Sequence, residues 1–285
     1  MKRTLSLALV SFLIFSSAQE GGVLAQGTTA PTRSSLRVLF VGNSYTFVNN
    51  LPDIVAGIAA VDPKSPTIVP VLATSGGKTL RWHLENGSAV KSLANGKWDF
   101  VVLQEQSLLG GRTTDGISVV GDPAEFHAPT REWVSRIRAA GATPILYMTW
   151  APREARLNAA KVQKDLADAY LNIGRDLKVK VAPVGLAWAE ARRRLNTLDL
   201  HTWDASHPAH AGSYLAALVI YSTLTGKSPL GAPAVIQGRP AVAAEDEMMR
   251  ADSSLRVPLI DVGQATATAL QEVAWTVALQ GSTAR

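Results

Sequence analysis

Five short apolar runs, separated by segments of helical periodicity, constrain the fold of this chain more than any other feature. The runs lack the alternation of apolar and polar residues that marks a strand with one face in water, which is typical of strands covered on both faces. Repeated strand–helix units with right-handed crossovers form a parallel sheet between helices. We therefore predict an α/β fold, a three-layer α/β/α sandwich around a five-stranded parallel sheet. The expected strands are residues 36–41, 67–72, 100–103, 144–148 and 179–184.

Between and after these strands, apolar residues at three- and four-residue spacing predict helices over residues 153–175 and 211–225 and near the C-terminus. Residues 110–122 are rich in glycine and threonine, which indicates a long loop after the third strand. Residues 228–256 are first proline-rich and then acidic, which indicates an irregular excursion before the last helix. No internal repeat or second linker is present, so we expect one domain over residues 35–285.

The N-terminal 25 residues have the pattern of a secretory signal peptide. Lys2 and Arg3 precede an apolar run over residues 5–15, and a small-x-small site predicts cleavage after Ala25. A membrane anchor is the alternative, but the run is shorter than the ~20 residues of a typical span. We therefore expect an exported protein, periplasmic or secreted, without a stable membrane anchor after cleavage. Residues 26–34 are small and polar and are predicted to form a short linker.

Composition excludes several classes of function. The chain has no cysteine, which rules out disulfides, thiolate metal sites and cysteine nucleophiles. Its net charge of +5 is a mild excess, and the one dense cationic run, residues 192–194, lies in a helical pattern. Nucleic-acid binding therefore has little support.

Ser44 is the first candidate for a nucleophile. It follows the first apolar run in the sequence Gly42-Asn43-Ser44, whose residue types allow tight backbone turns, and a helix is expected nearby. In parallel sheets of this kind, ligands bind beyond the carboxyl ends of the strands. A small hydroxyl residue that ends such a strand is therefore exposed where a substrate would lie. A serine hydroxyl needs a base to take its proton before it attacks.

Among the five histidines, His207 is the best candidate for that base. Asp204 lies three residues upstream in the same polar loop and can fix the imidazole tautomer, as the carboxylate of a triad does. The spacing alone is a weak signal, and the alternative is an Asp204 that caps a turn beside a surface histidine. A metal site made of His201, Asp204, His207 and His210 is a second alternative. Pro208 and the helix after it make convergence of all four difficult, so we expect no metal.

Acyl transfer also needs donors for the oxyanion that develops on the substrate. The Ser44 N–H can supply one, and Gly76 or Gly77, at the end of the second strand, can bring another close. Gln104 or Gln106, at the end of the third strand, could add a side-chain amide. The alternatives are an ordinary turn for the glycines and a hydrogen bond that closes the strand for the glutamines.

Taken together, four separated blocks in this order resemble the SGNH hydrolases, also called the GDSL esterase/lipase superfamily. The blocks are G-N-S near the N-terminus, S-G-G after the second strand, a polar end of the third strand, and D-x-x-H near the C-terminus. The resemblance covers about residues 36–227 and implies a flavodoxin-like sandwich. It also implies that Ser44 is the nucleophile, that Gly76 is the glycine of the oxyanion hole, and that Asp204 and His207 complete the triad.

Two blocks depart from the pattern of the family. The first reads G-N-S where many members have G-D-S, and the nucleophile is kept. The third usually contains G-x-N-D, whose asparagine donates to the oxyanion, whereas this chain reads Gln104-Glu105-Gln106-Ser107. Gln106 lies nearest the expected position and Gln104 shares its strand face, so the resemblance implies that a longer amide takes this role.

Three tryptophans, Trp82, Trp150 and Trp203, fall in or beside the predicted site loops. Aromatic faces suit sugar rings, although large aromatic residues are more often buried. With the predicted export, they favour a carbohydrate ester. We therefore expect a serine esterase that removes a short acyl group, with O-acetyl as the expected group, from a glycan or small-molecule ester and needs no cofactor. The alternatives are a non-catalytic carbohydrate-binding protein that retains the fold, and a metallohydrolase.

Overall fold

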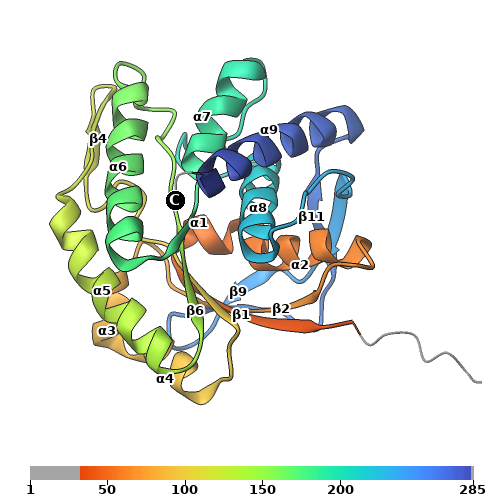
Figure 1. Cartoon of the computed structure of the whole chain (residues 1–285). Coiled ribbons are helices and arrows are strands. Elements are labelled where there is room, and N and C mark those ends of the chain that lie inside the picture. Colours follow the sequence, from red (N-terminus) through yellow and green to blue (C-terminus); the bar gives the residue numbers. More distant parts are fainter. Residues whose placement is uncertain (1–32, 284–285) are drawn as a thin grey trace, which may run out of the picture. The chain divides into compact units, whose positions relative to one another are not determined.

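A seven-stranded sheet forms the centre of the computed structural model, which describes residues 33–283 (Figure 1). The predicted signal peptide, residues 1–25, and residues 26–32 of the predicted linker lie outside the described residues. The order of the strands is β7-β6-β3-β1-β2-β10-β9. Five of them pair in parallel: β1 (Ser35–Gly42), β2 (Thr67–Thr74), β3 (Phe100–Leu103), β6 (Thr143–Tyr147) and β7 (Lys180–Ala182).

These five are the strands expected from the sequence, but the prediction that the sheet has only five strands is wrong. The two additional strands, β9 (Ala241–Ala243) and β10 (Met249–Ala251), extend the sheet beyond β2 in antiparallel orientation. Both come from residues 228–256, which were expected to be irregular. Each is three residues long, too short for a periodic pattern to show in the sequence.

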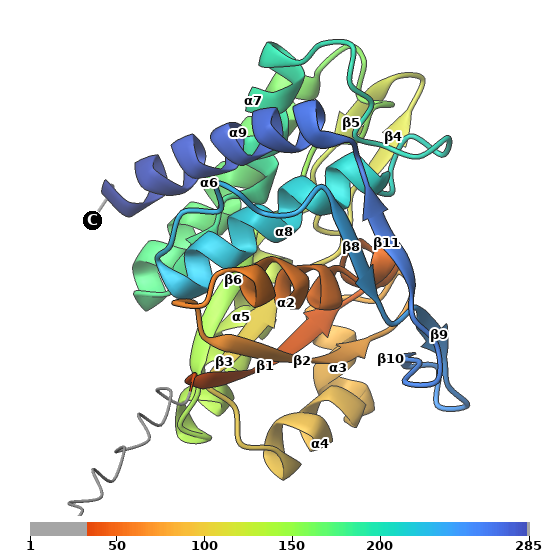
Figure 2. The ribbon, with the colours of Figure 1, turned by 90° about the vertical axis from the view of Figure 1, so that its right-hand side faces the viewer.

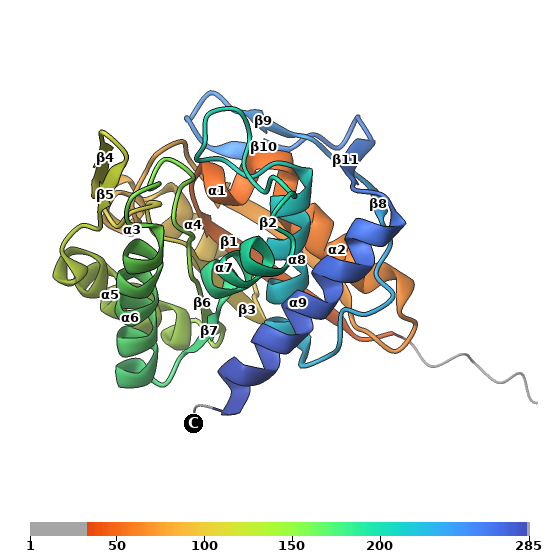
Figure 3. The ribbon, with the colours of Figure 1, turned by 90° about the horizontal axis from the view of Figure 1, so that it is seen from above.

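Helices cover both faces of the sheet (Figure 3). In β1, Val38 and Phe40 pack in one apolar cluster, whereas Leu39 and Val41 pack in another. This double burial explains the unbroken apolar runs. The first cluster includes α2 (Leu51–Val61), α7 (Val184–Arg194), α8 (His210–Thr225) and α9 (Gln264–Thr283), and the second includes α3 (Leu80–Asn86), α4 (Ser88–Asn95), α5 (Pro123–Ala139) and α6 (Ala159–Leu177).

Helix α8 lies between α2 and α9 (Figure 2). Most of its residues are therefore buried, on all sides of the helix. A helix that is apolar all round belongs inside a protein, and α8 acts here as part of the core. The loop that carries Asp204 and His207 leads directly into its first residue, which ties that loop to the most buried helix.

Two small two-stranded sheets complete the fold. Residues 110–122, expected to form a loop, contain β4 (Arg112–Thr114) and β5 (Ile117–Val119), so that expectation is wrong in part. The second pairs β8 (Val235–Gly238) with β11 (Val257–Asp261) in antiparallel orientation, with β9 and β10 between them in the sequence. Within residues 33–283, no helix combines the length and the apolarity that crossing a bilayer requires.

Candidate active site

Ser44 is the first residue of the short helix α1 (Ser44–Phe47), which begins two residues after β1 ends. The side chain of Asn43 accepts a hydrogen bond from the Tyr45 N–H and so caps this helix. Gly42 is required at the strand end because a Cβ there would lie 2.6 Å from Oε1 of Gln104. The sequence Gly-Asn-Ser thus turns the chain sharply and leaves the serine at the carboxyl edge of the sheet.

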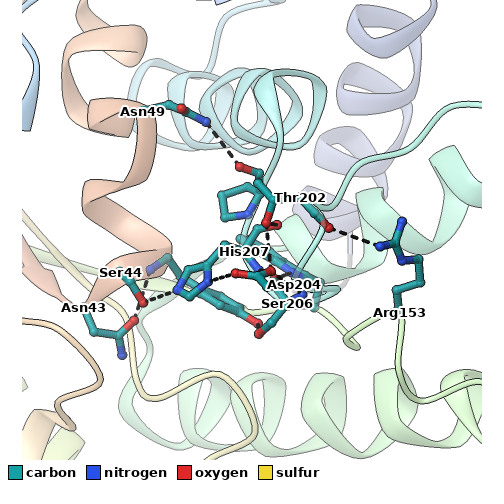
Figure 4. A network of polar contacts seen from close by, with 11 residues as sticks. Asn43, Ser44, Asn49, Arg153, Thr202, Asp204, Ser206 and His207 are labelled. Atoms are coloured by element: carbon teal, nitrogen blue, oxygen red, sulfur yellow. Dashed lines mark hydrogen bonds and ion pairs between the residues drawn. The ribbon is translucent and has the colours of Figure 1, made fainter. Parts of the chain in front are cut away.

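The structure brings Ser44, His207 and Asp204 together in one line of hydrogen bonds (Figure 4). Oγ of Ser44 lies 2.8 Å from Nε2 of His207. Nδ1 of the same ring lies 2.6 Å from Oδ2 of Asp204. The His207 side chain is 35% exposed, so a substrate can approach it from solvent. A hydroxyl, an imidazole and a carboxylate in this order can activate the hydroxyl for attack.

Asp204 is held as an anion by its surroundings. Its Oδ1 accepts hydrogen bonds from the N–H groups of Ser206 and His207 and from the Thr202 hydroxyl. Burial raises the pKa of the carboxyl, but these hydrogen bonds and the one from the His207 ring outweigh it and hold the pKa of Asp204 well below its usual range. The carboxylate can therefore only accept, so Nδ1 of His207 is the nitrogen that carries the proton between them.

Tyr45 joins the turn that carries Ser44 to the loop that carries His207, a role that the sequence did not indicate. Its hydroxyl lies 2.7 Å from Oγ of Ser206, and its ring meets the His207 ring edge-on, with centroids 5.8 Å apart. The ring also stacks on Trp150 at 4.3 Å, and Nε1 of Trp150 donates to the Ser206 carbonyl at 3.1 Å. Two buried aromatic side chains, Tyr45 and Trp150, thus connect the turn that carries Ser44 to the loop that carries His207.

The three tryptophans predicted to bind a sugar ring differ in how far they are exposed. Trp150 is 0% exposed and lies between Tyr45 and Trp188, so it offers no face to a substrate, and we do not retain it as a substrate contact. Trp82 is partly exposed, and the Lys78 ammonium lies over its ring at 4.8 Å. Trp203 is 93% exposed and directly precedes Asp204. It is the tryptophan best placed for a sugar ring.

Gly76 lies in a loop that is attached to the Ser44 turn at two points. The Ser75 N–H donates to the Gly42 carbonyl at 3.1 Å, and Nδ2 of Asn43 donates to the Lys78 carbonyl at 2.9 Å. Within residues 33–283, the N–H groups of Ser44 and Gly76 form no hydrogen bond. These two free backbone N–H groups, on turns that are joined to each other, can donate hydrogen bonds to a negatively charged substrate oxygen.

The two candidate glutamines have different surroundings. Gln104 is completely buried, and its amide nitrogen already donates to Asn43 Oδ1 and to the Glu105 carbonyl. It therefore stabilises the turn that carries Ser44. Because both amide hydrogens are used, the expectation that Gln104 donates to an oxyanion is wrong. Gln106 is partly exposed and donates one amide hydrogen to the Ser107 hydroxyl, so its second amide hydrogen is left for a ligand.

Glu105, between these glutamines, is a buried acid that the sequence did not single out. Its two carboxyl oxygens accept from the N–H groups of Leu80 and Gln106. Burial raises the pKa of Glu105 to about 7. Because Leu80 is the first residue of α3, this carboxyl anchors the end of the loop that carries Gly76.

The other four histidines do not join His207 around a common centre. His83 donates to the Gly42 carbonyl and His127 contacts the Ala169 carbonyl. His201 packs against Trp188, and His210 is exposed at the first position of α8. Burial lowers the pKa of both His83 and His201 to about 4. Across residues 33–283, no group of three or more histidine, aspartate or glutamate side chains is placed to hold a metal ion.

Comparison with known proteins identifies the fold. No family model and no curated protein matches the chain. Among solved structures, a protein assigned as an SGNH hydrolase from Slackia heliotrinireducens is 26% identical, with a TM-score of 0.53 over 67% of this chain and 100% of that one. The acetyl xylan esterase AlAXEase is 12% identical, with a TM-score of 0.53 over 66% of this chain and 98% of that one. This chain shares its fold with SGNH hydrolases.

A longer match links the chain to a DUF4886 family protein from Bacteroides uniformis. The two are 19% identical, with a TM-score of 0.61 over 86% of this chain and 95% of that one. The wider coverage shows that the resemblance in fold extends beyond the two thirds of the chain that match the other two structures.

Proposed function

We propose that this chain is an exported serine esterase that hydrolyses a short-chain ester, an O-acetyl group, on a carbohydrate. The observation that carries the proposal is the line of hydrogen bonds from Ser44 through His207 to Asp204, at 2.8 and 2.6 Å. It occurs at the carboxyl edge of a parallel sheet, in a fold shared with SGNH hydrolases. The class of enzyme, an ester hydrolase, rests on these structural neighbours, and the roles of the individual residues rest on the geometry.

The proposed mechanism begins at Nε2 of His207. With Nδ1 protonated and bonded to Asp204, the neutral ring accepts the Ser44 proton at Nε2 while Oγ attacks the ester carbonyl. The carbonyl oxygen becomes negative and is stabilised by the free N–H groups of Ser44 and Gly76, with the second amide hydrogen of Gln106 as a third donor. His207 then gives its proton to the leaving alcohol. Water, activated by the same ring, releases the acyl group from Ser44.

A carbohydrate ester is favoured by the surroundings of the serine. The exposed indole of Trp203 lies beside the loop that carries His207, and stacking on a sugar ring would shield this apolar surface from water. An acetyl xylan esterase has the same fold, which agrees with a sugar acetate as the substrate class. Export rests on the N-terminal 25 residues and gives access to polysaccharides outside the cytoplasm.

The test combines covalent labelling with hydrolysis of p-nitrophenyl acetate. Wild type should react with a fluorophosphonate at Ser44 in a 1:1 ratio, and Ser44→Ala should lose both the labelling and at least ~10³-fold of kcat/KM. Ser253→Ala, a change at an exposed serine away from the site, is the matched control and should behave as wild type. Equal rates in wild type and Ser44→Ala would exclude the mechanism. Glycan binding without labelling would instead identify a non-catalytic carbohydrate-binding protein.

A further inference from the structure

A cavity lies against the loop that carries Asp204 and His207, and Ala205 of this loop forms part of its lining. We propose that it binds a neutral sugar unit in the alcohol half of the ester, a proposal that rests on the esterase function above. Its volume is about 430 Å³, within the range of ~300–1,000 Å³ for small-molecule sites. The lining comes from three segments: Thr113 and Asp115 of the β4–β5 hairpin, Arg153, Glu154 and Arg156 after β6, and Ala205.

The walls of this cavity are fixed before any ligand binds. Asn158 holds the hairpin through two hydrogen bonds to the backbone of Ser118, at 3.0 and 2.7 Å. On the opposite wall, the Arg153 N–H donates to the Ala205 carbonyl at 2.8 Å, and the Arg153 guanidinium donates to the Thr202 carbonyl at 3.2 Å. The cavity wall and the loop with Asp204 and His207 are therefore one connected structure.

The polar groups of the cavity suit hydroxyl groups better than an ion or an acyl chain. The Arg156 guanidinium supplies donors, and the carboxylates of Asp115 and Glu154 supply acceptors. Arg153 also lines the cavity, but its guanidinium already pairs with Asp199 and donates to the Thr202 carbonyl. An anionic ligand would meet Asp115 and Glu154, and an alkyl chain would leave these charges without partners. The Arg156 guanidinium forms no hydrogen bond within residues 33–283 and lies beside Gly116: a Cβ added to that glycine would be 3.3 Å from a terminal guanidinium nitrogen of Arg156. It is therefore available to a ligand.

The chemistry of the ester brings the alcohol half to the loop that carries His207. The leaving oxygen must come within hydrogen-bond reach of His207 Nε2 to receive its proton, whereas the acyl oxygen faces Ser44 and Gly76. Ala205, two residues before His207, lines the cavity, and the exposed Trp203 belongs to the same loop. A cavity of about 550 Å³ on the other side of the loop is lined in large part by apolar residues, among them Leu198, Pro208 and Val262.

The experiment compares p-nitrophenyl acetate, which has no sugar, with an acetylated neutral xylo-oligosaccharide. Arg156→Ala and Glu154→Ala should each raise KM for the oligosaccharide about 5–10-fold, the loss expected for one or two hydrogen bonds, and leave kcat/KM for p-nitrophenyl acetate within about twofold. Asp261→Ala is the matched control because Asp261 lines the cavity on the other side of the loop. It should leave both substrates unaffected.

Failure of this inference differs from failure of the proposed function. If wild type does not hydrolyse p-nitrophenyl acetate, the esterase function itself is wrong. If it does, and both variants keep the wild-type KM for the oligosaccharide, the cavity does not bind the sugar. A larger effect of Asp261→Ala than of Glu154→Ala would move the sugar to the other cavity. Tighter binding of an acetylated uronic acid than of its neutral counterpart would overturn the neutral class of ligand.

Discussion

Gln104 is the residue whose removal tests most directly how the Ser44 turn is held. Its Oε1 accepts from the Asn43 N–H at 3.0 Å and from the Thr46 hydroxyl at 2.8 Å, and it is completely buried. Gln104→Met keeps the length of the side chain but leaves both donors without an acceptor. Each buried unsatisfied donor costs ~1–3 kcal/mol, so the free energy of unfolding should fall by ~2–6 kcal/mol. Because Asn43 precedes Ser44, kcat should also fall, by about 10–100-fold.

The measurements are urea unfolding and steady-state hydrolysis of p-nitrophenyl acetate at a temperature where the variant is folded. Gln237→Met is the control, because Gln237 is exposed in β8 and its side chain forms no hydrogen bond in the part of the chain described. It should change the free energy of unfolding by less than ~0.5 kcal/mol. If Gln104→Met were as stable and active as this control, Gln104 would not support the turn. A loss of stability with unchanged kcat would refute the link from Gln104 to Ser44.

Three further predictions concern buried or hydrogen-bonded charges. Asp204→Asn should lower kcat by on the order of 10³–10⁴-fold with little change in KM, because the tautomer of His207 is no longer fixed; a loss below tenfold would contradict the proposed role. Burial raises the pKa of Glu105 from its usual 4.5 to about 7, so its contribution to stability is complete below about pH 4.5 and is lost as the pH rises through about 7. The free energy of unfolding of wild type relative to Glu105→Gln should therefore fall by ~3 kcal/mol between pH 4 and pH 8, and a flat difference would refute the shift. Arg239→Met should destabilise the protein by ~2–4 kcal/mol, because the buried Asp53 loses both hydrogen bonds from the guanidinium and keeps only the one from the backbone N–H of residue 239; adding Asp53→Asn should recover part of this loss.

The parallel strands could be predicted because burial on both faces of the sheet produces a pattern within each strand's own sequence. A strand covered on both faces is an unbroken apolar run, and all five such runs became neighbours in one sheet. The antiparallel additions left no comparable mark, because β9 and β10 have three residues each and largely exposed side chains. The β4–β5 hairpin did have a signal in Asp115-Gly116, both at positive φ, a pair typical of tight hairpin turns.

Residue types and their spacing predicted which residues form the site. They did not predict the role of each aromatic or amide side chain around it. Ser44, Asp204 and His207 were named from strand ends and spacing, and the structure places them within hydrogen-bond reach of one another. Trp150 and Trp203 are the same residue type, yet one is buried in a stack and the other is almost fully exposed. That difference depends on Trp188 and other distant partners, which no local pattern reveals.

In the proposed mechanism, the position of the nucleophile relative to its base depends on the residue that follows the nucleophile. Tyr45 is attached to Ser44 by the backbone, yet its hydroxyl meets Ser206, which directly precedes His207. Burial raises the pKa of Tyr45 to about 12, so the phenol keeps its proton and this contact persists across the neutral range. The residues that carry the hydroxyl and the imidazole are therefore joined by a second route besides their own hydrogen bond. Because this route needs no substrate, binding energy is not used to bring Ser44 and His207 together and remains for orienting the ester.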